Sequence, residues 1–313
     1  MTLEIQPSGP FNLMNVNDYF GGWLSLNDDP TTTVMVFPVE GWRTSAAVLL
    51  QQAQGSVVGE VITHEADQER VWRQALSVLS LDESATDWHA VGDRDPIIGQ
   101  LQASYQGLRP VLFYSPYEAA AAFIIGHRIS IEQGRTIRQT IARTMGDCIQ
   151  VGDTQLYAFP RPQVLLELEQ YSSGLSDEKI RRLHGIAEAA LAGHLDRAYL
   201  RSLPCAQALQ QLRTLRGVGE FFAQAILYRG AGLVDVLPDD DVTKQAVQRA
   251  YKLTHLPTYA EVLERAEAWR PYRMWASVLL HVWFRREAGG PQRRNNTRTA
   301  RKSPTNGARS SIA

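Results

Sequence analysis

The chain is poor in cysteine and has no long apolar run. Its 313 residues include only two cysteines, Cys148 and Cys205. Two thiols cannot hold an iron–sulfur cluster bound by four thiolates, nor an all-cysteine zinc site. We also expect no disulfide between them in a reducing compartment. No stretch approaches the roughly 18 consecutive apolar residues of a membrane span, so we expect no membrane association.

Basic residues are absent from the first part of the chain. Residues 1–42 contain neither lysine nor arginine. A secretory signal begins with a positively charged region, and transit peptides are rich in arginine. We therefore expect a cytoplasmic protein.

The charge is unevenly distributed. The whole chain has a net charge of −1. Residues 285–313 carry eight basic residues and one acidic residue, a net charge of +7, so residues 1–284 carry −8. A nucleic-acid ligand would have to be held by local basic clusters and by backbone amides at its phosphates. Deleting residues 290–313 is expected to lower such affinity and its salt dependence.

The pattern of residues predicts an α+β chain with two folded parts and a tail. Within residues 1–110, the segments 34–38, 46–50 and 56–62 are typical of strands, and 66–80 has helical spacing. From residue 115 the chain is predicted to be almost continuously helical. Ser115 opens a helix with a capping box that includes Glu118, and Ser176 caps a helix. Helices are predicted at 176–192, 258–269 and 271–286. We predict a mixed α/β domain at 1–110, a helical domain at 111–288, and a disordered basic tail at 289–313.

One stretch, residues 212–245, combines a glycine turn with an acidic cluster. Gly217 and Gly219 flank Val218, an apolar helix follows, and Pro238 then precedes three consecutive aspartates. A helix that starts at glycine leaves its first N–H groups uncapped and can accept a phosphate. Taken separately, the two features also have plain structural explanations, because glycine turns start many helices and aspartate is a common N-cap.

The order L-x-G-V-G, apolar helix, V-x-L-P-D-D resembles the helix-hairpin-helix DNA glycosylases. It is most similar to the DNA-3-methyladenine glycosylase II branch, whose pattern is P-G-I-G-x-W-T-A followed by F-P-D-D. Residues 107–130 and 175–196 resemble further segments of that family's helical core, whereas residues 1–110 match loosely. The resemblance implies an N-terminal antiparallel sheet domain followed by an all-helical helix-hairpin-helix domain. It also implies a monomer that acts on double-stranded DNA with damaged bases.

The resemblance assigns the catalytic acid and the type of reaction. Asp240 matches the family's catalytic aspartate, which leaves Asp239 and Asp241 as capping or solvent-facing residues. A fixed carboxylate stabilises the cationic sugar that forms as the glycosidic bond breaks. Phe221 stands where bifunctional glycosylase/lyases carry a nucleophilic lysine. The resemblance therefore implies a monofunctional enzyme.

The resemblance also proposes contacts with the damaged base. Phe221 and Tyr272 match two positions where the 3-methyladenine branch has stacking tryptophans, although Phe221 would also suit the core. Arg128 matches the residue that fills the gap left by the flipped base, where relatives carry an apolar side chain. Four aromatic residues near the N-terminus are either core or part of the base pocket: Phe11, Tyr19, Phe20 and Trp23.

The hairpin is expected to hold DNA. By resemblance, Gly217, Val218 and Gly219 bind a phosphate, and a monovalent cation, Na⁺ or K⁺, binds the carbonyl groups of Arg213, Leu215 and Val218. Catalysis itself is expected to need no cofactor. Lys244 lies one turn after Asp240, where it could neutralise a phosphate, moderate the charge of Asp240 or simply face solvent.

The sequence thus predicts a monofunctional DNA glycosylase that excises alkylated bases, chiefly 3-methyladenine and 7-methylpurines. Two alternatives stay open. One is a glycosylase for oxidised bases, and the other is a non-catalytic helix-hairpin-helix protein that binds damaged DNA.

Overall fold

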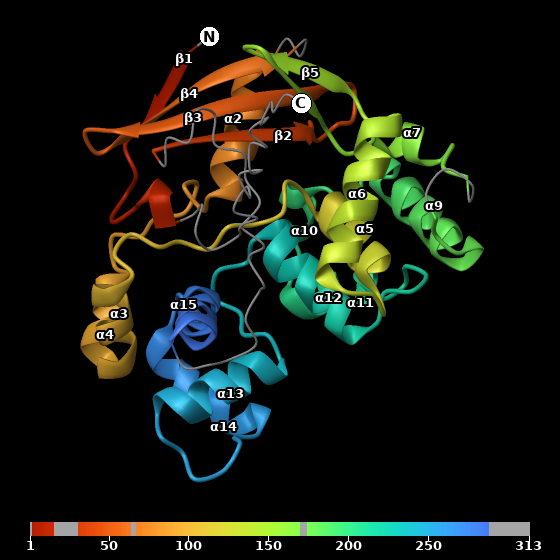
Figure 1. The fold of residues 1–313 in the computed structure, drawn as a ribbon. Coiled ribbons are helices and arrows are strands. Elements are labelled where there is room, and N and C mark those ends of the chain that lie inside the picture. Colours follow the sequence, from red (N-terminus) through yellow and green to blue (C-terminus); the bar gives the residue numbers. More distant parts are fainter. Residues whose placement is uncertain (1, 16–30, 64–66, 170–173, 288–313) are drawn as a thin grey trace, which may run out of the picture.

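The N-terminal part of the chain forms an antiparallel sheet. A computed structural model describes residues 2–15, 31–63, 67–169 and 174–287 (Figure 1). The strand order is β1-β4-β3-β2, and the strands are Thr2–Ile5 (β1), Thr32–Pro38 (β2), Ser45–Ala53 (β3) and Ser56–Thr63 (β4). The three strands predicted at 34–38, 46–50 and 56–62 are therefore confirmed, and β1 adds a strand that we did not predict.

Helix α2 (Gln68–Val78) covers one face of this sheet. Its buried side includes Val71 and Ala75, two of the residues that predicted the helix. Trp72 packs directly over Gly59 of β4, where an added Cβ would lie 2.1 Å from the indole ring. The glycine therefore allows the helix to lie close to the sheet.

A hairpin from the mainly helical part of the chain covers the other face. Strands β5 (Cys148–Val151) and β6 (Thr154–Tyr157) pair with each other. Val151 and Leu156 pack against Val34 and Ala47 of the large sheet. Our sequence prediction of nearly continuous helix after residue 115 is wrong here, because the sheet has a second apolar face that must be buried.

The helices form two neighbouring groups below the sheet (Figure 1). One group has α5 (Pro116–Gly126), α6 (Ile131–Met145), α7 (Pro162–Leu165), α9 (Asp177–Leu191), α10 (Arg197–Ser202), α11 (Cys205–Leu212), α12 (Glu220–Ala225) and the π-helix η2 (Ile226–Ala231). The other has α3 (His89–Arg94), α4 (Pro96–Ser104), α13 (Asp241–Ala250), α14 (Tyr259–Ala266), the 3₁₀ turn η3 (Glu267–Trp269) and α15 (Arg273–Arg286). Both groups share one apolar core.

Most helix starts agree with the sequence. Ser176 caps α9 and Ser115 caps α5, each accepting a bond from a backbone N–H. The reciprocal half of a capping box at Ser115 is absent, because the Glu118 side chain is turned inward and its Oε1 has no partner. Helix α15 begins at Arg273 and not at Pro271, since Tyr272 has a non-helical ψ of 35°.

The two cores do not divide the chain at a single residue, since Val111 still packs into the core of the sheet. Trp88, Leu101 and Tyr105 pack into the helical core with α15, and not into the core of the sheet. The tail predicted at 289–313 lies outside the described residues. Within the described part of the chain, no helix combines the length and the apolar character needed to cross a bilayer.

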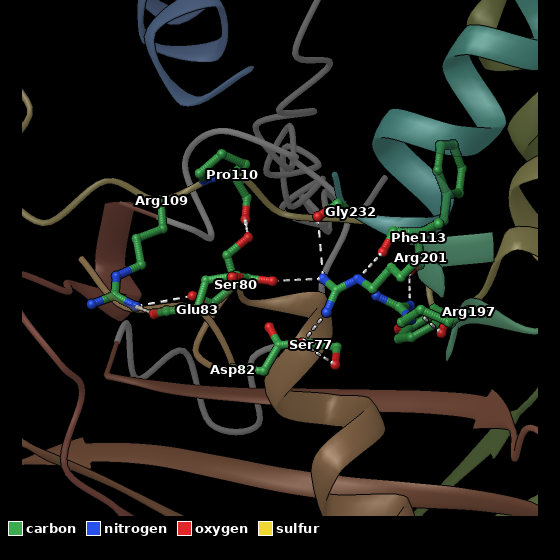
Figure 2. A network of polar contacts seen from close by, with 12 residues as sticks. Ser77, Ser80, Asp82, Glu83, Arg109, Pro110, Phe113, Arg197, Arg201 and Gly232 are labelled. Atoms are coloured by element: carbon green, nitrogen blue, oxygen red, sulfur yellow. Dashed lines mark hydrogen bonds and ion pairs between the residues drawn. The ribbon is translucent and has the colours of Figure 1, made fainter. Parts of the chain in front are cut away.

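Two arginines hold the loop after α2, and one of them, Arg201, joins it to the helical part (Figure 2). The fully buried Arg109 donates to backbone carbonyls that include those of Ser80 and Glu83. Arg201 of α10 forms ion pairs of 3.0 Å with Asp82 and Glu83, and it also donates to the carbonyl of Gly232. The bonds of Arg201 fix the loop after α2 to the end of η2. The loop that leads to the three aspartates follows η2 directly.

Candidate active site at the hairpin and the acid loop

The predicted glycine hairpin connects α11 to α12. The Val218 N–H donates to the Leu215 carbonyl at 3.0 Å, which closes the turn. Gly217 has a φ of +84°, and a Cβ at this position would lie 2.5 Å from Cδ of Arg182. Gly219 is the N-cap of α12 and offers no capping side chain. The first N–H groups of α12 therefore have no side-chain cap, as the sequence predicted.

The loop between η2 and α13, residues 233–239, is anchored by the neighbouring helices. Three of its anchors are hydrogen bonds to helices α14 and α15. The Met274 N–H donates to the Val234 carbonyl (3.0 Å), Arg273 to the Asp235 carboxylate (2.7 Å), and the Tyr259 hydroxyl to the Leu237 carbonyl (2.9 Å). These bonds come from the start of α15 and from α14. The acid at the end of the loop therefore has a fixed backbone.

Asp240 is the N-cap of α13. Its Oδ1 accepts from the Thr243 N–H and its Oδ2 from the Thr243 hydroxyl, each at 2.7 Å. The Asp240 side chain is 15% exposed, whereas that of Asp241 is 84% exposed. Asp241 thus faces solvent as expected, but the cap is Asp240 itself. Since each carboxylate oxygen keeps a further lone pair, capping leaves Asp240 able to face a ligand.

Lys244 binds the acid that precedes Asp240. Its Nζ lies 2.6 Å from Oδ1 of Asp239, and this contact raises the pKa of Lys244. The Asp239 N–H in turn donates to Oε1 of Gln224 on α12. Lys244 is thus paired with Asp239, and a role toward a phosphate or toward Asp240 stays a prediction.

The start of α12 carries an aromatic surface. Phe221 is 56% exposed, and its ring centroid lies 6.0 Å from that of Phe222. Phe222 stacks on Phe123 of α5 and meets the edge of His127 at 5.6 Å. Arg128, the next residue, is exposed with a φ of +58°. The structure thus places the turn that carries Arg128 beside the helix that carries Phe221.

Tyr272 lies in a different place. It is only 6% exposed, and its hydroxyl donates to the Ser84 carbonyl at 2.9 Å. Its ring packs against Trp88 and Trp275 in the helical core. The structure therefore presents no free face of Tyr272 to a base. Phe11 packs against the core of the sheet, and the other three N-terminal aromatics lie outside the described residues.

The hairpin offers backbone oxygens for the predicted cation. The Leu215 carbonyl already accepts one hydrogen bond within the turn, which leaves one of its two lone pairs for a cation. Among the residues that the structure describes, no three His, Cys, Asp or Glu side chains gather in a way that could hold a metal ion. A monovalent cation on hairpin carbonyls therefore stays a prediction.

Three residues of the site were missed from the sequence: Thr243, Gln224 and His281. His281 of α15 lies 2.8 Å from the Thr243 hydroxyl and 3.5 Å from Oδ1 of Asp240. Burial lowers the pKa of His281 to about 4, although the Asp240 charge opposes this shift. Thr243 could have been found as the third residue after an N-cap. His281 is 38 residues from Thr243, and nothing in the sequence pairs them.

Comparison with known proteins gives relatives and structural neighbours whose names describe DNA glycosylases. No family model matches the chain. A DNA-3-methyladenine glycosylase of Bacillus subtilis is 23% identical over 208 residues, covering 64% of this chain and 68% of the relative. DNA-3-methyladenine glycosylase 1 of Schizosaccharomyces pombe is 26% identical over 127 residues, which are 39% of this chain and 56% of that protein.

Solved structures extend the similarity over the whole fold. A 3-methyladenine DNA glycosylase from Archaeoglobus fulgidus superposes with a TM-score of 0.75 at 21% identity, covering 90% of this chain and 97% of that one. An 8-oxoguanine glycosylase/lyase from Clostridium acetobutylicum, solved with double-stranded DNA, gives 0.67 at 18% identity over 90% and 97% of the two chains. The resemblance inferred from the sequence is thus confirmed: the chain is related to the DNA-3-methyladenine glycosylases and has the fold of the helix-hairpin-helix DNA glycosylase superfamily.

Proposed function

We propose that this protein is a monofunctional DNA glycosylase that excises alkylated bases from duplex DNA in base excision repair. Its substrates would be 3-methyladenine and 7-methylpurines. The observation that carries the proposal is the state of Asp240. This carboxylate is mostly buried, has both oxygens hydrogen-bonded, and ends a loop anchored to the hairpin helix through Gln224.

Asp240 would act on the sugar of a flipped nucleotide. Breaking the glycosidic bond leaves positive charge on the deoxyribose ring, and a fixed carboxylate in a poorly solvated site stabilises that charge. Because the Thr243 bonds already hold the Asp240 side chain, little reorganisation is needed as the charge develops. The same carboxylate can orient the attacking water.

The hairpin would hold the DNA backbone. The uncapped N–H groups that follow Gly219 suit a phosphate. The carbonyl groups of Arg213, Leu215 and Val218 would hold a Na⁺ or K⁺ ion, which supplies positive charge next to that phosphate. Since flipping a base costs a few kcal/mol, these sequence-independent contacts would be needed to offset it.

Phe221 supports both the substrate class and the absence of lyase chemistry. An exposed aromatic ring at the start of α12 can stack on a base, and a cationic methylated base gains from its π-face. Phenylalanine has no amine, so it cannot form a Schiff base with the sugar. Arg128, exposed in the neighbouring turn, would fill the gap in the duplex.

The test uses duplex oligonucleotides that contain a single 3-methyladenine, 7-methylguanine or 8-oxoguanine. Strand breaks that appear only after alkali treatment indicate monofunctional excision. Breaks without alkali would contradict monofunctional chemistry, and tight binding without base release would favour the non-catalytic alternative. Asp240→Asn should abolish release and leave DNA binding intact; unchanged turnover would remove Asp240 from the mechanism.

Excision of oxidised bases is the second candidate. Its support is the structural similarity to an 8-oxoguanine glycosylase/lyase. Phe221 in place of a nucleophilic lysine speaks against the lyase half of that activity. Release of 8-oxoguanine faster than of either methylated base would favour this candidate.

A further inference from the structure

A chain of hydrogen bonds runs from α15 to the candidate catalytic acid. The Nε2 atom of His281 lies 2.8 Å from the Thr243 hydroxyl, which lies 2.7 Å from Oδ2 of Asp240. Thr243 is 1% exposed and the His281 side chain 13% exposed. The three groups come from two helices packed against each other, α13 and α15.

The protons in this chain can be assigned from the chemistry of its members. An ionised carboxylate only accepts hydrogen bonds, so the single hydroxyl proton of Thr243 points to Asp240. The hydroxyl oxygen must then accept from His281, which places the imidazole proton on Nε2. Burial, together with Arg285 and Arg229, lowers the pKa of His281 and keeps the ring neutral against the attraction of Asp240. The direction of donation is therefore His281 to Thr243 to Asp240.

Capping alone does not account for this arrangement. The Thr243 N–H already satisfies the N-cap bond to Oδ1 of Asp240, and any residue type with an N–H would provide it. The hydroxyl and the imidazole are additional polar groups in a helix–helix contact, where burial costs free energy unless they are paired. Their bonds hold the second carboxylate oxygen of Asp240, which the N-cap bond alone does not hold.

We propose that Thr243 and His281 are positioning residues that hold the Asp240 carboxylate in one rotamer toward the sugar of the flipped nucleotide. This inference rests on the proposed glycosylase activity. Thr243 acts directly on Oδ2. His281 acts mainly through Thr243, by fixing the rotation of its hydroxyl, because its 3.5 Å separation from Oδ1 of Asp240 is long for a hydrogen bond. Neither residue exchanges a proton with the substrate.

The experiment measures single-turnover release of 7-methylguanine and, separately, affinity for the same duplex. Thr243→Val keeps the shape and removes the hydroxyl, so release should slow by about tenfold or more while affinity stays within about threefold. Thr243→Ser restores the hydroxyl and should restore the rate. His281→Phe should slow release, and His281→Gln, which can present an N–H, should recover part of it.

Two comparisons separate positioning from packing. Thr243→Val combined with His281→Phe should be no slower than Thr243→Val alone, because His281 acts through the missing hydroxyl. Ser277→Ala is the matched control, since Ser277 is also buried on α15 but donates to the Met274 carbonyl. Its rate should not change. An unaltered rate in Thr243→Val, or additive effects in the double variant, would overturn the inference.

Nitrogen NMR of the His281 ring gives a readout independent of activity. A proton on Nε2 and none on Nδ1 at pH 7 is the expected result. A proton on Nδ1 alone would mean that Thr243 donates to His281 and not to Asp240, which overturns the chain. If wild-type protein releases no base, the proposed function fails and the positioning role fails with it. If wild type is active and Thr243→Val is equally active, only the positioning role fails.

Discussion

The side-chain oxygen of Gln224 accepts a hydrogen bond from the Asp239 N–H at 3.3 Å. This bond links the helix after the glycine hairpin to the residue that precedes the candidate acid. The Gln224 amide group also donates to Glu220 one turn earlier. The helix after the glycine hairpin and the residue before Asp240 are therefore connected through one polar side chain.

Replacing Gln224 with methionine should slow base release without weakening DNA binding. Methionine has a similar length but cannot accept the Asp239 N–H bond, so the acid loop loses one anchor. We expect release to slow by about three- to tenfold, because small displacements of a reacting group are costly. Gln210→Met, on the exposed side of α11, serves as the control. An equal loss of affinity and rate would contradict this role.

The two hairpin glycines should differ when replaced by alanine. Gly217→Ala places a Cβ at a φ of +84° and 2.5 Å from Arg182, so it should destabilise the fold by about 1–2 kcal/mol. Gly219→Ala has a φ of −86° and no atom within 4 Å of the added Cβ. Its stability should change by less than about 1 kcal/mol, so the larger effect should appear in DNA affinity. Urea unfolding and DNA titration of both variants test this difference.

Phe221 should contribute to substrate binding and not to stability. It is 56% exposed, so Phe221→Ala should alter the free energy of unfolding by less than about 0.5 kcal/mol. Loss of a stacking ring should slow the excision of 7-methylguanine by about fivefold or more. Phe221→Trp should match or exceed wild type, since its ring is larger. Leu256→Ala, at a 47% exposed position, is the control. Normal excision by Phe221→Ala would exclude the stacking role.

Two buried glutamates, Glu118 and Glu40, should each contribute stability that falls as the pH rises above 4.5. Burial raises the pKa of Glu118 to about 8, against the opposing charge of Arg138, and raises that of Glu40 to about 7, against Arg197. Both start from an ordinary value of 4.5. Between these values the unfolded chain releases protons that the folded chain keeps, so the folded state loses stability as the pH rises.

Glu118→Gln removes one of these ionisations. Its free energy of unfolding should vary less between pH 5 and 8.5 than that of wild type, by at least about 1 kcal/mol. Urea unfolding at the two pH values measures this difference. Glu60→Gln, at an exposed position of β4, should behave as wild type. The same pH dependence in Glu118→Gln and wild type would mean that Glu118 is ionised in the folded state.

Local patterns were sufficient for the elements whose signals are local. The β-branched segments predicted β2 to β4, serine caps predicted α5 and α9, and two glycines followed by an apolar helix predicted the hairpin. The β5–β6 hairpin was missed, because it forms where it can cover the second apolar face of a sheet whose strands lie more than 80 residues earlier. Residues 85–108 were predicted to belong to the sheet domain, but their apolar side chains pack into the helical core. Local patterns do not show which of two cores a segment joins.

The sequence by itself determined the order of the site: a glycine turn, a helix with an aromatic start, and an aspartate cluster. These features depend on residue type and on spacing along the chain, because turns, caps and helix faces are set by residues close together in sequence. Only the tertiary structure decided which aspartate caps α13, that Tyr272 is buried, and that His281 meets Thr243. The cap is a local contact, but the burial of Tyr272 and the approach of His281 depend on how α15 packs against distant parts of the chain. Such an approach leaves no periodic trace in either segment.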